Sequence, residues 1–212
     1  MHQFYCYGRA CKDAYENGDD EDFIARFKAE SLEAFEEVTL CRPDFAEAYY
    51  FLGYGYINLG LYIKAKLTWD EFMKLSKDEE KKKEISERLD SLEEPVEIEE
   101  GYNMILSGKF DDGIAVLEKY TESKFQDWWP LWYYLGVAYS CVGELRAAEE
   151  HLKRVLKLSP SNTETMSELV NVYEKLGEEE MAEKYRKKIE IVAENVEKDR
   201  EEVMKDRGVK IN

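Results

Sequence analysis

The feature of this sequence that most constrains its fold is a pattern that occurs more than once along the chain. The two clearest copies both read aromatic-x-x-Leu-Gly-x-x-Tyr, at residues 49–56 and at residues 132–139. Each copy is followed by a glycine, then by a small residue five positions on, then by a large apolar residue four positions further. These are Gly60, Ala65 and Trp69 in the first copy and Gly143, Ala148 and Leu152 in the second. A chain that repeats such a pattern is predicted to fold as a series of similar structural units.

Two further copies extend the pattern. One starts 34 residues after Trp132, with Met166, Leu169 and Tyr173 at the corresponding positions of the pattern. A degenerate copy occupies residues 101–117. Within a copy the apolar residues recur at i, i+3, i+4 and i+7, which indicates one face of an α-helix. The glycine after each copy is expected to end that helix in the left-handed conformation; these glycines are Gly60, Gly108, Gly143 and Gly177.

These residues resemble the tetratricopeptide repeat, a family whose period and signature they match at nearly every position. The resemblance covers residues 44–76 and 94–207 well, and residues 3–43 loosely. It implies an all-α fold: an α-solenoid of antiparallel helix hairpins in a right-handed superhelix, with about five units and a long C-terminal helix. Neighbouring hairpins would bury each other's apolar faces, since one hairpin cannot do so alone.

Each repeat is predicted to contain a second, amphipathic helix after its glycine. The expected second helices span residues 62–75, 111–124, 145–158 and 179 onward. Small residues should lie where the two helices of a pair cross and allow them to approach closely. The pairs expected there are Gly53 with Ala65 and Gly136 with Ala148.

The chain is predicted to consist of an N-terminal part, residues 1–76, and a C-terminal part, residues 95–212, joined by a helical spacer at 77–94. Residues 1–43 form an atypical first unit, with helices at 3–16 and 22–41, and residues 44–76 form a good repeat. The second helix should bury Phe23, Phe27, Phe35 and Val38.

The spacer breaks the register of the repeat. Glu79 and Lys83 form a favourable i, i+4 pair, as do Glu84 and Arg88, so a helix is expected there. Its apolar stripe is narrow, and Pro95 is expected to interrupt it. We therefore interpret this segment as an unpaired helix or spacer at which the chain bends.

The last helix is expected to run through residues 178–207. Its apolar stripe consists of Ile189, Ile191, Val192, Val196 and Val203. We expect it to cover the last repeat as a cap, because terminal repeats need a polar outer face. The alternative is a partner helix in a homodimer.

In the repeat family, ligands usually lie in a concave groove lined by the first helices. The resemblance places Tyr50, Tyr54, Ile57 and Asn58 there in the first good copy, Tyr133, Val137, Ser140 and Cys141 in the second, and Ser167, Asn171, Glu174 and Lys175 in the third. Such a wall suits an extended peptide or an amphipathic helix. The tyrosines could equally pack between adjacent helices, and both interpretations remain open. One family subtype binds a partner's C-terminal carboxylate through Lys and Asn, and here only Asn171 fits.

A tryptophan-rich segment precedes the second copy. Asp127 is expected to cap the helix, with Pro130 in its first turn. Trp128 and Trp129 are expected to pack this repeat onto the preceding one, because two exposed tryptophans would be a liability. The alternative is an exposed contact patch.

The net charge of −17 argues against nucleic acid and against anionic membrane surfaces as partners. The acidity is concentrated in residues 13–47, where a basic partner could be attracted. The alternative is an ordinary solvated surface. With neither a signal-like N-terminus nor an apolar run of membrane length, a cytoplasmic location is the default expectation.

Catalytic and metal-binding motifs are lacking in the sequence. His151 is expected to be solvated, the four cysteines to be buried thiols, and the carboxylates to be solvated with ordinary pKa values. A metal site at His2, Cys6 and Cys11 does not have a recognised zinc spacing. The sequence thus predicts a non-catalytic scaffold, without a cofactor, that binds a protein or peptide; the alternatives are a self-associating assembly protein and an enzyme on a repeat fold.

Overall fold

The computed structural model describes the backbone of residues 2–17 and 21–206, and within these ranges it leaves undescribed the side chains at 15, 21–25, 196, 197 and 199–206. All regular structure in the described residues is helical. The chain forms two compact units, residues 1–100 and 101–212. The predicted all-α fold of paired helices is confirmed.

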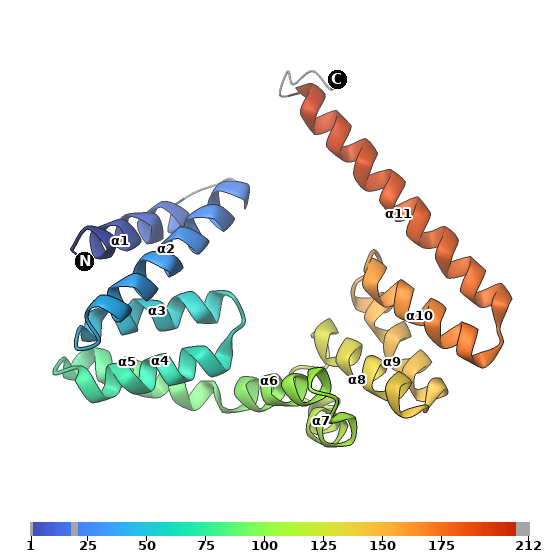
Figure 1. The fold of residues 1–212 in the computed structure, drawn as a ribbon, viewed down its shortest axis with the longest axis horizontal. Coiled ribbons are helices and arrows are strands. Elements are labelled where there is room, and N and C mark those ends of the chain that lie inside the picture. Colours follow the sequence, from blue (N-terminus) through green and yellow to red (C-terminus); the bar gives the residue numbers. More distant parts are fainter. Residues whose placement is uncertain (1, 18–20, 207–212) are drawn as a thin grey trace. The chain divides into compact units, whose positions relative to one another are not determined.

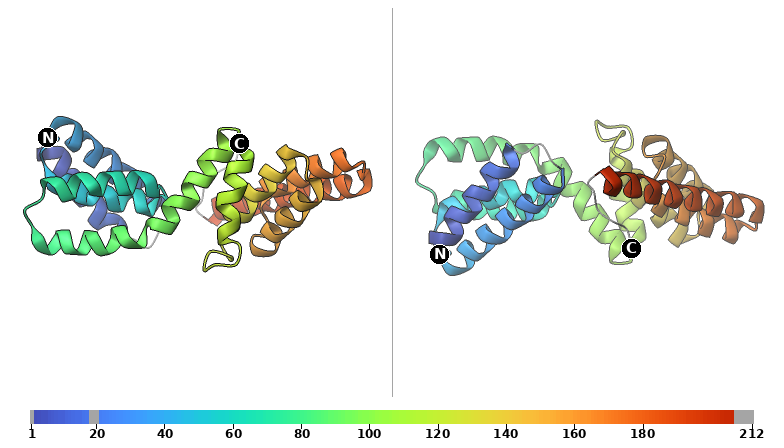
Figure 2. Two further views of the ribbon diagram at one scale, coloured as in Figure 1. Left: turned by 90° about the horizontal axis from the view of Figure 1, so that it is seen from below. Right: turned by 90° about the horizontal axis from the view of Figure 1, so that it is seen from above.

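Unit 1 is a succession of antiparallel helices, each packed on the next (Figure 1). The first two run side by side, as Figure 2 shows from two other directions. The helices are α1 (His2–Glu16), α2 (Glu21–Cys41), α3 (Ala46–Asn58), α4 (Tyr62–Leu75) and α5 (Glu79–Ser91). Their bounds agree closely with the helices predicted for residues 3–16, 22–41 and 62–75.

The core of unit 1 is aromatic. Phe35, Trp69 and Phe72 are almost completely buried, and Phe35 stacks on Phe51 of α3 with ring centroids 5.3 Å apart. Val38 is also buried, as predicted, while Phe27 is half-buried. The side chain of Phe23 lies outside the described residues.

Gly53 shows why a residue without a side chain is needed where α3 and α4 cross. A Cβ atom at this position would lie 2.1 Å from the indole nitrogen of Trp69. The prediction of a close approach is therefore confirmed, but the nearest neighbour is the large residue Trp69 rather than Ala65. The same ring donates a hydrogen bond from Nε1 to the carbonyl oxygen of Tyr50, at 3.1 Å.

The predicted spacer is a packed helix, so the interpretation as an unpaired helix is wrong. α5 contacts α4, and Ile85 is fully buried in the unit 1 core. The helix does end shortly before Pro95, since α5 stops at Ser91. A separate helix, α6 (Glu93–Leu106), starts at Glu93 and holds Pro95 in its first turn, where the missing N–H has no intrahelical partner to lose.

Unit 2 contains the end of α6, followed among its described residues by five α-helices and one 3₁₀ turn (Figure 1). α8 packs on both α7 and α9, α10 packs on α9 and α11, and α8 also contacts α10 directly. Direct contact between the first helices of successive pairs is the arrangement expected of a helical repeat. The elements are α7 (Phe110–Leu117), a 3₁₀ turn η1 (Glu118–Tyr120), α8 (Trp129–Val142), α9 (Leu145–Leu158), α10 (Thr163–Leu176) and α11 (Glu179–Asp206).

The prediction of a helix over residues 111–124 is wrong at its C-terminal end, because α7 stops at Leu117. The hydroxyl groups of Thr121 and Ser123 donate to the carbonyl oxygens of Glu118 and Tyr120, at 2.9 and 2.7 Å. Such local side-chain bonds compete with helix propagation and favour turns. The second helix predicted over 145–158 is α9 and matches its bounds.

The predicted helix-ending glycines are confirmed. Gly143 has φ of 89° and Gly177 has φ of 74°, both in the left-handed region, and Gly60 and Gly108 also have positive φ. Gly136 repeats the role of Gly53. A Cβ there would lie 2.6 Å from Leu152, so the glycine allows α8 and α9 to pack closely.

The last helix is long, as predicted. α11 has 28 residues, whereas α10 has 14. Its N-terminal part packs on α10 through Ala182 and Tyr185, both buried, with Ile189 and Val192 packed against the same core. Ile191 is 56% exposed. The side chains of Val196 and Val203, also part of the predicted stripe, lie outside the described residues.

Candidate functional site

The repeat in unit 2 buries its signature residues in its own core. Trp132 and Leu135 are buried on α8, and Leu152 is buried on α9. The indole Nε1 of Trp132 donates to the carbonyl oxygen of Gln126, at 2.7 Å, so the ring also ties down the loop before α8. The side chains on the buried face of α8 therefore pack in the core, and a binding surface on this helix must use its other positions.

The predicted groove tyrosines of unit 1 contact another helix of the same unit. The Tyr50 hydroxyl donates to Oε2 of Glu84 at 3.0 Å, and the Tyr54 hydroxyl donates to Oε1 of the same carboxylate. Burial, followed by the bond to Glu84, raises the pKa of both phenols. Lys81 of α5 lies over the Tyr50 ring, 5.0 Å from its centroid. The sequence interpretation missed Glu84, because α5 was not expected to pack here.

The other two predicted groove positions of unit 1 differ in their exposure to solvent. Ile57 is half-buried and packs against the unit 1 core, whereas Asn58 is exposed at the end of α3. The four positions therefore do not form one open wall in this unit.

In unit 2, the predicted groove positions on α8 are partly covered. Tyr133 packs against the core that α9, α10 and α11 share, and its ring lies 6.2 Å from that of Trp129. Burial raises the pKa of Tyr133, and the charges of Glu168 and Glu164 raise it further. Val137 is half-buried, Ser140 is buried, and Cys141 is exposed.

Two groove positions of the third copy have partners on neighbouring helices. Nζ of Lys175 donates to Oγ of Ser140 at 3.2 Å, which joins α10 to α8. Glu174 forms an ion pair with Arg186 of α11. Ser167 and Asn171 are exposed on α10. The exposed predicted positions of unit 2 that have no side-chain partner on a neighbouring helix are therefore Cys141, Ser167 and Asn171, and Val137 beside them on α8 is half-buried.

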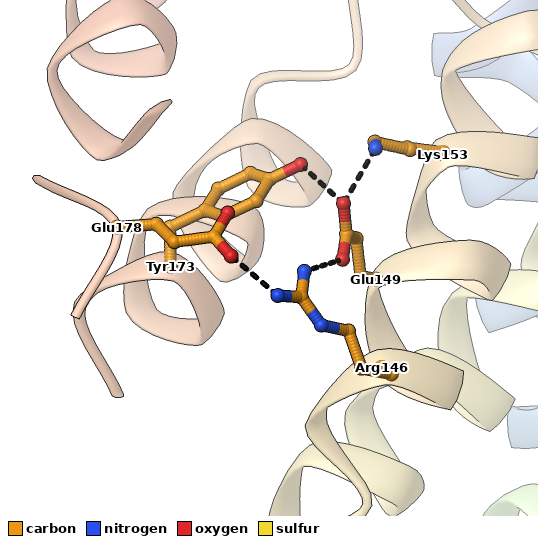
Figure 3. A network of polar contacts seen from close by, with 5 residues as sticks. All are labelled: Arg146, Glu149, Lys153, Tyr173 and Glu178. Carbon is orange, nitrogen blue, oxygen red and sulfur yellow. Dashed lines mark hydrogen bonds and ion pairs between the residues drawn. The ribbon is translucent and has the colours of Figure 1, made fainter. Parts of the chain in front are cut away.

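A polar network joins the second helix of one repeat to the next repeat (Figure 3). The Glu149 carboxylate accepts from Lys153 at 2.5 Å, from Arg146 at 2.7 Å and from the hydroxyl of Tyr173 at 2.9 Å. Arg146 also pairs with Glu178, immediately before α11. Burial alone would raise the pKa of Glu149, but the three donors together lower it to about 2. The prediction that carboxylates keep ordinary pKa values is wrong here.

His151 is not solvated, so that prediction is also wrong. Its ring stacks against Tyr139 and Trp132, with centroid distances of 5.2 and 5.6 Å and interplanar angles of 13° and 21°. Burial lowers the pKa of His151, against the opposing charges of Glu150 and Glu118. The side chain is a packing element between two aromatic rings, which favours a neutral imidazole.

Trp128 packs onto the preceding helix as expected, whereas the ring contact of Trp129 is with its own helix α8. Trp128 is half-buried and contacts Tyr102 of α6, with centroids 5.7 Å apart, and Trp129 packs on Tyr133. The N-cap of α8 is Trp128 without a side-chain hydrogen bond, so the prediction of Asp127 as the cap is wrong. Pro130 does lie in the first turn.

Three of the four cysteines differ from the prediction. Cys11 is buried, but Cys6, Cys41 and Cys141 are exposed. Within the described residues, the histidine, cysteine and acidic side chains form no cluster of three suited to a metal ion. No helix of the described chain has the length and apolarity that a membrane crossing requires.

The packing of successive helix pairs defines a helical-repeat protein. Residues 129–162, which comprise α8, α9 and the following turn, match the family model of the tetratricopeptide repeat. The chain thus contains a tetratricopeptide repeat, and the resemblance noted in the sequence is confirmed there.

Several solved structures are similar to this chain at low identity. A crystal structure of MamA is 21% identical, covers 85% of this chain and 99% of its own, and has a TM-score of 0.49. MamA from Desulfovibrio magneticus RS-1 is 16% identical, with 92% and 97% covered and a TM-score of 0.48. PilW, a widely conserved type IV pilus biogenesis factor, is 14% identical, with 92% and 79% covered and a TM-score of 0.49. No curated protein matches the sequence.

Proposed function

We propose that this protein is a non-catalytic scaffold that binds a peptide or helix of a partner protein along the first helices of unit 2. The observation that carries the proposal is the exposure of Cys141 on α8 and of Ser167 and Asn171 on α10, with the half-buried Val137 beside them. The two helices contact each other directly, so these positions belong to neighbouring segments. A surface of this kind, with apolar and hydrogen-bonding groups together, suits an extended peptide or an amphipathic helix.

The predicted groove residues would contribute to binding in different ways. Tyr133 would form the apolar side of the groove, beside Val137, while Asn171 would donate to or accept from the partner's backbone. Ser140 would act indirectly by holding Lys175 in place. Tyr50 and Tyr54 receive no anchoring role, because Glu84 already binds both hydroxyl groups. Ile57 and Asn58 lie with them in unit 1 and receive none either.

A pair of matched variants tests this function. Asn171→Arg places a long charged side chain on α10 within the proposed groove, whereas Asn195→Arg makes the same change on α11, where Asn195 is also exposed. Wild type and both variants serve as baits for affinity capture from the native cells. A partner should elute with wild type and with Asn195→Arg, and be reduced at least about tenfold with Asn171→Arg. Equal capture of the same proteins by all three baits would remove the proposed groove.

A second candidate function is self-association through α11. It rests on Ile191, which is 56% exposed, and on Met181 and Lys184 of the same helix, which line one surface pocket with it. Apolar side chains that lie together on one surface are typical of interaction sites. Sedimentation over a range of concentrations tests this, with Ile191→Glu as the variant that should dissociate an oligomer. A strict monomer at all concentrations would exclude it.

A further inference from the structure

The outer face of the first helix hairpin carries an open groove. α3 packs on the other face, where Leu32 meets Gly55 and Phe35 stacks on Phe51. The groove lies between α1 and α2 and has a volume of about 380 Å³. It belongs wholly to unit 1 and is distinct from the groove proposed on α8 and α10.

The floor of this groove is apolar and exposed. Phe4 and Tyr7 of α1 are 45% and 47% exposed, and Leu40 of α2 is 74% exposed. Phe4 and Tyr7 are three residues apart on one helix, so they present adjacent rings to the same side. Large apolar side chains gathered in this way on one surface, rather than scattered singly, are typical of an interaction site.

The rim of the groove is acidic, and two of its four carboxylates have no internal partner. Glu30 binds Arg26 and the Tyr7 hydroxyl, and Glu36 accepts from the hydroxyl of Tyr56 at 2.7 Å. Glu33 and Glu37 are exposed, and neither carboxylate has a hydrogen bond or ion pair with any described residue. No lysine or arginine lines the groove in the described part of the chain. A ligand with positive charges on both sides of an apolar stripe would complement this surface.

We propose that this groove binds a basic amphipathic helix of a partner protein. The residues of α2 that line the groove run from Glu30 to Leu40, which is about 15 Å at 1.5 Å per residue and corresponds to roughly three turns of a bound helix. Apolar residues at i, i+3, i+4 and i+7 of that helix would contact Phe4, Tyr7 and Leu40. Lysine or arginine beside them would reach Glu33 and Glu37. A second copy of this chain is a poorer occupant, since each copy carries a net charge of −17.

The probe is a synthetic helical peptide of about 18 residues, or five turns, with leucines on one face and lysines on the other. Binding to the full chain is measured by fluorescence anisotropy. The double variant Glu33→Lys, Glu37→Lys should weaken binding at least about tenfold. The control Glu87→Lys, Glu150→Lys makes the same charge change at two other exposed helical glutamates and should have a much smaller effect.

A further variant distinguishes a groove from mere attraction between opposite charges. Leu40→Glu adds negative charge but removes the apolar floor, so the proposal expects weaker binding of the basic peptide by at least about tenfold. Its control is Leu67→Glu, an exposed leucine on α4, 60% exposed, which should bind the peptide as wild type does or slightly more tightly. If Leu40→Glu binds as tightly as Leu67→Glu, the peptide is held by net charge alone and the proposal is wrong.

Two further outcomes complete the test. Asn171→Arg should leave peptide binding unchanged, so a failure of this groove can be told apart from a failure of the groove on α8 and α10. If sedimentation shows an oligomer that Leu40→Glu dissociates and Leu67→Glu does not, the occupant is a second copy, and the assignment to a basic partner is overturned.

Discussion

The hydroxyl of Tyr173 donates to Oε1 of Glu149 at 2.9 Å and so joins α10 to the preceding helix α9. The same carboxylate accepts from Lys153 and Arg146, and Arg146 continues to Glu178 (Figure 3). One acceptor thus links two successive repeats and the start of α11. Because the carboxylate is largely buried, its loss would leave several donors without a partner.

Glu149→Ala is therefore expected to destabilise unit 2 by about 2 kcal/mol. The control is Glu150→Ala, since Glu150 is adjacent and exposed and forms no hydrogen bond with the described residues. Its change should stay within about 0.5 kcal/mol of wild type. Urea unfolding followed by tryptophan fluorescence measures both. Equal stability of the two variants would show that the network contributes nothing.

The same residue predicts how stability depends on acid. The folded pKa of Glu149 is about 2, below its ordinary value near 4.5, so the folded state favours the ionised form. The stabilisation is fully present above about pH 4.5 and is lost as the pH falls towards 2. Glu149→Gln should make the unfolding free energy less dependent on pH in that window. Parallel curves for wild type and Glu149→Gln would contradict the prediction.

His151 leads us to expect a second pH dependence of the folding stability, at higher pH. Burial between two aromatic rings lowers its pKa, so the unfolded chain binds a proton more readily than the folded one. Stability is highest above the unfolded pKa of about 6.5 and is lost as the pH falls through the folded value. His151→Phe retains an aromatic ring and should remove this loss between about pH 5 and 7. Thermal melts across that range measure it.

Gly136→Ala tests the close approach of α8 and α9. An added Cβ would lie 2.6 Å from Leu152, so helices or side chains must shift, at a cost of about 1–3 kcal/mol. Alanine has the higher helix propensity, so a local effect alone would stabilise the variant. The sign of the change in denaturation midpoint therefore decides whether packing at this crossing limits the repeat.

The sequence predicted the repeat and most helix bounds because the signature residues carry strong local signals. Gly143 and Gly177 end helices by their left-handed conformation, and Gly136 allows two helices to cross closely. Each of these features depends on the type of a single residue, so each can be predicted from the sequence. The error at α7 arose from side-chain hydroxyls in the turn after Leu117, which the repeat pattern does not encode.

The candidate sites were harder to predict, because they depend on which helices cover which faces. The burial of Ile85 and the hydrogen bonds of Glu84 with two tyrosines require α5 to pack on its neighbours. No local sequence pattern predicts that packing. His151 lies among charged residues in sequence, yet its ring is enclosed by Tyr139 and Trp132 from the partner helix. In both cases the surroundings of the side chain depend on tertiary packing.

The most direct test of the central claim is the affinity of the captured partner for the groove on α8 and α10. Titration calorimetry with the purified partner should give a dissociation constant at least about tenfold higher for Asn171→Arg than for wild type, and an unchanged value for Asn195→Arg. Tyr133→Ala should weaken binding by about 2 kcal/mol, if the variant retains the wild-type helical content. Identical dissociation constants for all four proteins would contradict the proposal that this surface binds the partner.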